Sequence, residues 1–143
     1  MNHLHRLFFL LIISTGQVLA ELPPSAYEAM QKQAPEALEI EVLRVELSEL
    51  PKPEDPEALK KPWPSHKVTV TATVTKILRT ASKLEEGQFI NIIYNLEERP
   101  KMWAGPGVIP LLKKDAKVPA FLERVGGTSD FTPAAGAMSF SKF

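Results

Sequence analysis

The clearest structural signal in the sequence is a strictly alternating run, Val68-Thr69-Val70-Thr71-Ala72-Thr73-Val74-Thr75. Aliphatic residues occupy every second position of the run, and four threonines occupy the positions between them. Successive side chains of a β-strand point to opposite faces, and β-branched residues favour strands. The run therefore predicts a long strand with one face in an apolar core and a threonine face toward solvent.

A second alternating run changes phase near its middle. Its first half places Leu38, Ile40 and Val42 on one face, and its second half places Leu43, Val45 and Leu47 on the other. A β-bulge or sharp coil at Val42-Leu43 would return both halves to a single core face. Long strands that bend in this way occur where a sheet curls into a barrel.

Three shorter apolar segments complete the set of predicted strands. They are Phe89–Tyr94, Val118–Leu122 and Met138–Ser141. Gly87 can supply the positive φ for the turn before the first of them. Pro119 has no N–H to donate to a ladder, so we expect it at a sheet edge or a bulge. The stretch Gly126–Gly136 is predicted to be a loop, with Phe131 tucked under a turn.

A short helix over residues 25–34 is predicted ahead of the strands. Ser25 and Glu28 have the spacing of a capping box, in which each side chain accepts a hydrogen bond from the backbone N–H of the other residue. Pro35 ends the helix, because proline disrupts a helix interior.

Together these elements predict a mainly β fold, a five-stranded barrel of the OB class with one short N-terminal helix. The length of 143 residues suits one domain, which we place at residues 21–143. Residues 49–66 contain five prolines and are expected to form a stiff, partly extended connection.

The first twenty residues have the organisation of a secretory signal peptide. Arg6 precedes an apolar run, Leu7–Ile13, and compact side chains stand at Val18 and Ala20. Cleavage after Ala20 would leave Glu21 as the first residue. The apolar run has seven residues, against the ~20 that a spanning helix needs, so no membrane span is expected after signal removal. The alternative is an uncleaved N-terminal anchor.

The composition bears on both location and chemistry. The chain has no cysteine, which excludes disulfides, cysteine-ligated zinc and thiol catalysis. An exported protein without disulfides suits a bacterial periplasm or exterior, so a secreted or periplasmic location is predicted. Lys plus Arg is 17 and Asp plus Glu is 17, and a balanced charge gives no general signal for nucleic acid. No nucleic-acid partner is therefore predicted.

The ionisable residues do not form a recognisable catalytic pattern. Once the signal is removed, His66 is the only histidine, whereas zinc sites and Ser-His-Asp triads need further partners. Glu39 and Glu41 are two residues apart and share one face of a strand, as solvated carboxylates do. We therefore predict no catalytic residue, no metal and no cofactor.

Two tryptophans stand out as candidate partner-binding residues. Trp63 lies between Pro62 and Pro64, and Trp103 precedes Gly105-Pro106-Gly107. Indoles on stiff loops are large and lose little entropy when they are fixed, so they can anchor a protein or carbohydrate partner. The alternative is that each tryptophan covers one end of the barrel.

The order of these segments resembles the netrin-module group of OB folds, whose best-known members are the tissue inhibitors of metalloproteinases. The resemblance rests on Val68–Val74 followed by Phe89–Tyr94, on the irregular stretch Trp103–Leu112, and on the return strand Val118–Leu122. It implies the barrel fold. Those inhibitors chelate zinc through an N-terminal cysteine, which this chain lacks, so no inhibitory residue carries over.

Three functions follow from these observations as hypotheses. The favoured one is an exported, non-catalytic binding module with an unknown protein or carbohydrate partner. The second is a protease-inhibitor-like protein, suggested by the resemblance alone. The third is an unrecognised hydrolase, which would need a deep pocket with a strongly perturbed ionisable side chain.

Overall fold

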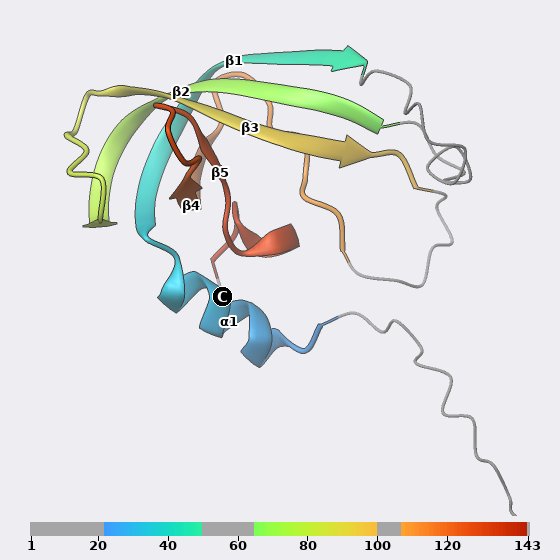
Figure 1. Ribbon diagram of the computed structural model, residues 1–143, viewed down its shortest axis with the longest axis horizontal. Coiled ribbons are helices and arrows are strands. Elements are labelled where there is room, and N and C mark those ends of the chain that lie inside the picture. The colour runs from blue at the N-terminus through green and yellow to red at the C-terminus, as the bar shows by residue number, and fades with distance from the viewer. Residues whose placement is uncertain (1–21, 50–64, 100–106, 143) are drawn as a thin grey trace, which may run out of the picture.

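One α-helix, five strands and a short 3-10 helix make up the regular structure of the computed structural model, which describes residues 22–49, 65–99 and 107–142 (Figure 1). In chain order they are α1 (Pro24–Gln33), β1 (Glu36–Glu49), β2 (Ser65–Thr80), β3 (Phe89–Glu97), β4 (Lys117–Arg124), β5 (Phe131–Pro133) and η2 (Gly136–Met138). The expected signal peptide, the cleavage position at Ala20 and Glu21, and most of the proline-rich connection lie outside the described residues.

The strands close into a barrel in the order β1-β2-β3-β5-β4, and β4 pairs with β1 to complete the circle. All neighbours are antiparallel except β3 and β5, which run parallel with Ile92 opposite Phe131. The prediction of a mainly β, five-stranded barrel with one short N-terminal helix is therefore confirmed. The arrangement is compatible with an OB-like fold.

Strand β2 has the predicted alternation. Its aliphatic side chains Val68, Val70, Ala72 and Val74 are all completely buried. Its threonines Thr69, Thr71 and Thr73 are partly exposed on the opposite face, as period-two geometry requires.

Strand β1 contains the predicted bulge. In its pairing with β2, Val42 lies opposite Ala72 and Arg44 lies opposite Thr71, so Leu43 is the extra residue. Beyond the bulge Val45 pairs with buried Val70, which puts the second half of β1 back on the core face. Leu43 itself differs from the prediction: it is exposed, because the inserted residue falls outside the alternation.

A single apolar cluster fills the barrel. It consists of Leu38, Ile40, Val42, Val68, Val70, Ala72, Val74, Leu84, Ile90, Ile92, Tyr94, Leu112, Ala120, Leu122, Phe131 and Phe140. Every strand contributes to it, so these side chains form a packed core inside the barrel.

The start of α1 differs from the prediction. Pro23 is the N-cap, Pro24 is the first helical residue, and no side chain caps the helix, so the capping box of Ser25 and Glu28 is wrong. The physical reason is that proline at the first helical position has its φ already set and needs no N–H partner. Ser25 therefore lies inside the first turn.

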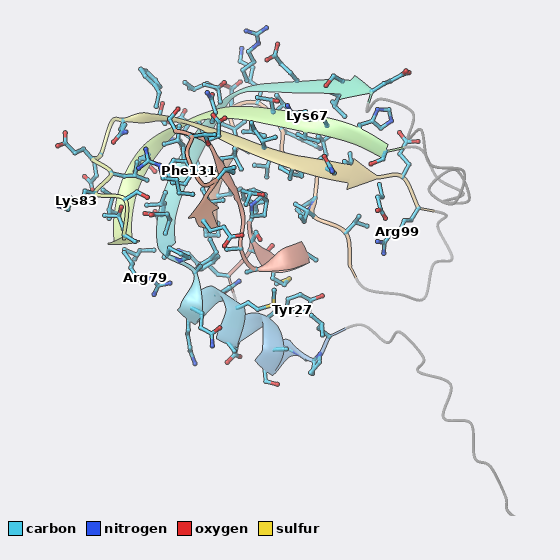
Figure 2. All side chains as sticks on the ribbon, in the orientation of Figure 1. Tyr27, Lys67, Arg79, Lys83, Arg99 and Phe131 are labelled. Atoms are coloured by element: carbon cyan, nitrogen blue, oxygen red, sulfur yellow. The ribbon has the colours of Figure 1, made fainter. Side chains whose placement is uncertain are left out.

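Helix α1 is attached to the barrel by two polar side chains. Buried Gln31 donates through Nε2 to the carbonyl oxygens of Met138 and Ser141, at 2.8 Å each. Arg79 of β2 donates to the carbonyl oxygens of Ala34 (2.8 Å) and Gln31 (2.8 Å) at the C-terminal end of the helix (Figure 2). These bonds fix the helix against the C-terminal segment and against β2.

The fifth strand was expected at Met138–Ser141, and this is wrong. The strand is Phe131–Pro133, inside the stretch predicted to be a loop. It is only three residues long, Phe131 is its one large apolar side chain, and Pro133 has no N–H to donate. Phe140 is buried instead by packing near Tyr94, with ring centroids 6.0 Å apart.

Pro119 lies where the sheet has a free side, as predicted. It sits opposite Glu39 of β1, whereas β5 reaches only Leu122–Arg124 of β4. Phe121, two residues further along, donates its N–H away from β1 to Ser139, so the ring nitrogen of Pro119 also faces away from β1. No ladder bond to β1 is lost.

Among the described residues no helix is long and apolar enough to cross a membrane.

Candidate binding surface

Both tryptophans of the predicted partner site, Trp63 and Trp103, lie outside the described residues. The sheet register nevertheless shows where their segments are joined to the barrel. Ser65, two positions after Trp63, lies opposite Glu97, which is six positions before Trp103. The two segments are therefore connected to the same end of the β2–β3 ladder.

The described residues contain a different candidate at the other end of β3. Phe89 is the first residue of β3 and follows the turn at Gly87, whose φ of +86° suits glycine. Strand alternation buries Ile90 and Ile92 and turns Phe89 outward. Phe89 is 68% exposed, the largest exposed fraction among the described large apolar residues.

A small pocket of about 130 Å³ adjoins Phe89. It lies between the β2–β3 connection and the β4–β5 connection, near the place where β3 meets β5 at Phe131. Its walls are Ser82, Leu84, Gln88, Phe89, Ile90, Asn91, Arg124, Ser129 and Phe131. We call these residues the Phe89 surface.

The polar groups of the Phe89 surface are arranged mainly as donors. Asn91 Oδ1 accepts from the Thr71 hydroxyl at 3.2 Å, and Gln88 Oε1 accepts from the Glu85 N–H at 3.0 Å. Each amide oxygen thus already accepts one hydrogen bond, and the amide NH₂ groups can donate to a ligand. Arg124 Nε is held by the Thr128 carbonyl at 3.0 Å, which leaves its terminal nitrogens. Such a surface suits a ligand rich in oxygen acceptors.

A buried carboxylate supports one wall of this pocket. Glu36 is completely buried, and its Oε1 accepts the N–H of the pocket residue Ser82 at 2.9 Å. The second carboxylate oxygen, Oε2, is buried and has no hydrogen-bond partner among the described residues. The bond between Ser82 and Glu36 Oε1 joins the β2–β3 connection to the start of β1. Glu36 therefore positions the connection and is not itself part of the pocket lining.

The other ionisable residues raised by the sequence form isolated pairs. His66 Nε2 lies 3.2 Å from Glu98 Oε1 at the end of the β2–β3 ladder. Glu39 lies 3.0 Å from Lys142, and this ammonium group lowers the pKa of the Glu39 carboxyl. Glu41 lies 3.7 Å from Lys117. Residues 22–49, 65–99 and 107–142 contain no cluster of three or more acidic or histidine side chains that could hold a metal.

Sequence reasoning missed Phe89 and Arg124. The sequence pattern predicts Phe89 only as the first residue of an apolar strand, although its parity with Asn91 places it on the same face as that polar residue. Arg124 has no such signal, because the closure of β5 between β3 and β4 is what brings it near Phe89.

The chain was also compared with protein-family models, with curated proteins and with solved structures, and no match was found. The netrin-module resemblance therefore has no support beyond the barrel itself. The proposal of a function rests on the geometry of the Phe89 surface.

Proposed function

We propose that the protein is an exported, non-catalytic binding module that recognises a carbohydrate through the Phe89 surface. The observation that carries this proposal is an aromatic residue, Phe89, that is 68% exposed beside a pocket whose lining includes the donors Gln88, Asn91 and Arg124. Exposed aromatic rings on rigid strands offer a flat apolar platform, and fixing them costs little conformational entropy.

The chemistry of the pocket favours a sugar over a purely apolar ligand. A sugar ring presents C–H groups on one face and hydroxyl, and in some sugars carboxylate, oxygens around its edge. The Phe89 ring would pack on the C–H face, while Gln88, Asn91 and Arg124 would donate to the oxygens. Arg124 gives a preference for an acidic sugar, because its guanidinium forms stronger, charge-assisted hydrogen bonds with a carboxylate.

Trp63 and Trp103 remain part of the proposal as a second partner surface. Their segments are joined to the far end of the β2–β3 ladder, at Ser65 and Glu97, about 27 Å of strand from Phe89. A ligand that binds both ends would therefore have to be extended, as a polysaccharide chain is.

Titration of the purified protein with neutral and acidic oligosaccharides tests the proposal. Phe89→Ala should weaken binding about tenfold or more, because it removes the stacking platform, and Arg124→Gln should weaken binding of acidic sugars alone. Leu78→Ala is the matched control, since Leu78 is also exposed and lies outside the pocket. Equal affinity of wild type and Phe89→Ala for every sugar bound would exclude the Phe89 surface as the site.

The export part of the proposal has its own test. Expression of the full chain in a bacterial host, followed by fractionation and N-terminal sequencing, should find a mature protein that starts at Glu21 outside the cytoplasm. A cytoplasmic protein that retains Met1 would contradict it. We also propose that the barrel is related to the netrin module. We propose no inhibitory activity for it, because the chain has no cysteine.

A further inference from the structure

The second half of β1 is an open sheet edge. Residues Glu36–Glu41 pair with β4, and Val42 bonds to Asp115 and Ala116 on that same side. From Arg44 to Glu49 β1 pairs with β2, and no other described segment pairs with the outer side of Leu43–Glu49. Figure 1 shows this half of β1 running along the margin of the sheet with no strand beyond it.

The hydrogen-bonding groups of this edge can be assigned from the alternation of β2. Val74 donates its N–H to Gln88, on the β3 side. Val70 and Val68 follow at even steps along β2, so their backbone groups also face β3 and not β1. Their partners Val45 and Leu47 therefore direct their own N–H and C=O groups outward, to the open edge.

The side chains along the edge are self-complementary. If two copies meet antiparallel with Val45 opposite Val45, then Arg44 of each copy lies opposite Glu46 of the other. Leu43, 37% exposed, and Leu47, 49% exposed, then lie opposite each other. Val45 forms the hydrogen-bonded pair and Arg44–Glu46 the non-hydrogen-bonded pair, in which side chains approach most closely.

Neighbouring registers lack this match. A centre at Glu46 sets two like charges opposite each other, which is destabilising. A centre at Leu47 sets Glu46 opposite Ser48 and leaves Arg44 without an acidic partner across the edge. The charge pattern therefore selects the centre at Val45.

We propose that the protein forms a homodimer in which the Leu43–Glu49 edges of two copies pair antiparallel about a two-fold axis at Val45. The two β1–β2–β3 ladders become one six-stranded sheet. Open edges that are not paired or protected are sites of unwanted association, and closed two-fold pairing removes the edge on both copies at once.

Charge reversal and charge exchange test the register. Arg44 and Glu46 are exposed and form an ion pair within one copy, so their substitution leaves the core unchanged. Arg44→Glu should raise the dimer dissociation constant about tenfold or more, because it places two pairs of like charges across the axis. The exchange Arg44→Glu with Glu46→Arg should restore it to within about threefold, measured by sedimentation or light scattering over a dilution series.

A cysteine scan gives an independent measurement, because the chain has no native cysteine. Val45→Cys should form an interchain disulfide under mild oxidation, since directly opposed hydrogen-bonded residues have Cα atoms about 5.5 Å apart. Leu47→Cys is the control: Leu47 would lie about 13 Å along the strand from its own copy and should not crosslink. Circular dichroism checks that each variant is folded.

A protein that stays monomeric up to millimolar concentration would overturn the proposal. A dimer that is indifferent to Arg44→Glu and crosslinks at neither position would equally overturn it. If wild-type protein is monomeric and an added extended peptide protects the Leu43–Glu49 amides from hydrogen exchange, the edge receives a partner strand instead, and the homodimer is wrong.

Discussion

The two halves of β1 show how differently one alternating pattern can be used. In the half before the bulge, Leu38, Ile40 and Val42 have no exposed surface. This half lies between β2 on one side and β4, with the adjoining residues Asp115 and Ala116, on the other. In the half after it, β2 is the only described segment that pairs with the strand. Leu47 is 49% exposed there, although it shares the core face with Val45.

The difference between the halves comes from the neighbouring strands and not from the residues themselves. Both halves alternate apolar and charged residues, and both pair with the same strand, β2. Alternation determines which way a side chain points, whereas the depth of burial depends on what closes over that face. In the first half, the closed barrel covers the core face of β1. In the second half, β1 and β2 extend beyond the last residue that pairs with β4.

The largest expected difference in stability is between two substitutions in β1. Ile40→Ala lies in the half before the bulge, the closed half, and Leu47→Ala lies in the half after it, the open half. Ile40→Ala should lower the free energy of unfolding by about 2–5 kcal/mol, because it leaves a cavity in a packed core. Leu47→Ala should lower it by about 1 kcal/mol or less, since half of that side chain is in water. Urea unfolding at low protein concentration measures both, and similar losses would show that the halves are equally buried.

A substitution at Arg79 tests how helix α1 is attached to the barrel. Arg79→Met removes both hydrogen bonds to the carbonyl oxygens of Ala34 and Gln31 and should cost about 1–2 kcal/mol of stability. Lys76→Met, on the same strand and also exposed, should cost much less. Hydrogen exchange should show faster exchange of the α1 amides in Arg79→Met alone. Uniform loss of protection over the whole barrel would mean that the helix is not a separate unit.

The barrel itself could be predicted from local patterns. Strand alternation at Val68–Val74 and the phase change at Val42-Leu43 are backbone properties that one segment carries by itself. Both predictions are confirmed by the burial of β2 and by the register of β1.

The parts that could not be predicted depend on contacts between distant segments. The strand Phe131–Pro133 is defined by its neighbours β3 and β4, and three residues carry no period of their own. Met138–Ser141 looked more apolar, yet its Phe140 is buried by contact with Tyr94 and not by strand pairing. The Phe89 surface depends on the same closure, because it joins residues from β3 and β4. The tryptophan prediction at Trp63 and Trp103 remains a prediction.

A substitution at Tyr94 tests what holds the segment around Pro110 against the core face of the open half. It lies opposite Val68, which lies opposite Leu47, and its hydroxyl donates to the Pro110 carbonyl at 2.9 Å. Tyr94→Phe removes this bond and should lower stability by about 0.5–1.5 kcal/mol at neutral pH. A near-neutral result would mean that the segment around Pro110 is held by apolar packing alone.

Tyr94 also predicts that the stability of the fold decreases at alkaline pH. Burial raises the pKa of the Tyr94 phenol above its ordinary value of 10.0. The unfolded chain releases this proton at lower pH than the folded chain does, so stability is fully present below pH 10 and is lost as pH rises through the folded pKa. Tyr94→Phe should remove this part of the alkaline loss, whereas Phe140→Leu, which alters only packing against the ring, should keep it.

The smallest expected effect concerns the ion pair between Glu39, in the closed half of β1, and Lys142 near the C-terminus, 3.0 Å apart. Because Lys142 lowers the pKa of Glu39 in the folded protein, the pair stabilises above the unfolded carboxyl pKa of 4.5, and its contribution is lost as pH falls through the folded pKa. Lys142→Met should therefore lower the melting temperature slightly at pH 7 and low salt. The difference from wild type should disappear at acid pH and in about 1 M salt, where exposed charges are screened. Lys114→Met, also exposed, controls for the change in net charge. If the difference persists in high salt, the aliphatic stem of Lys142 stabilises the closed half by packing and not by charge.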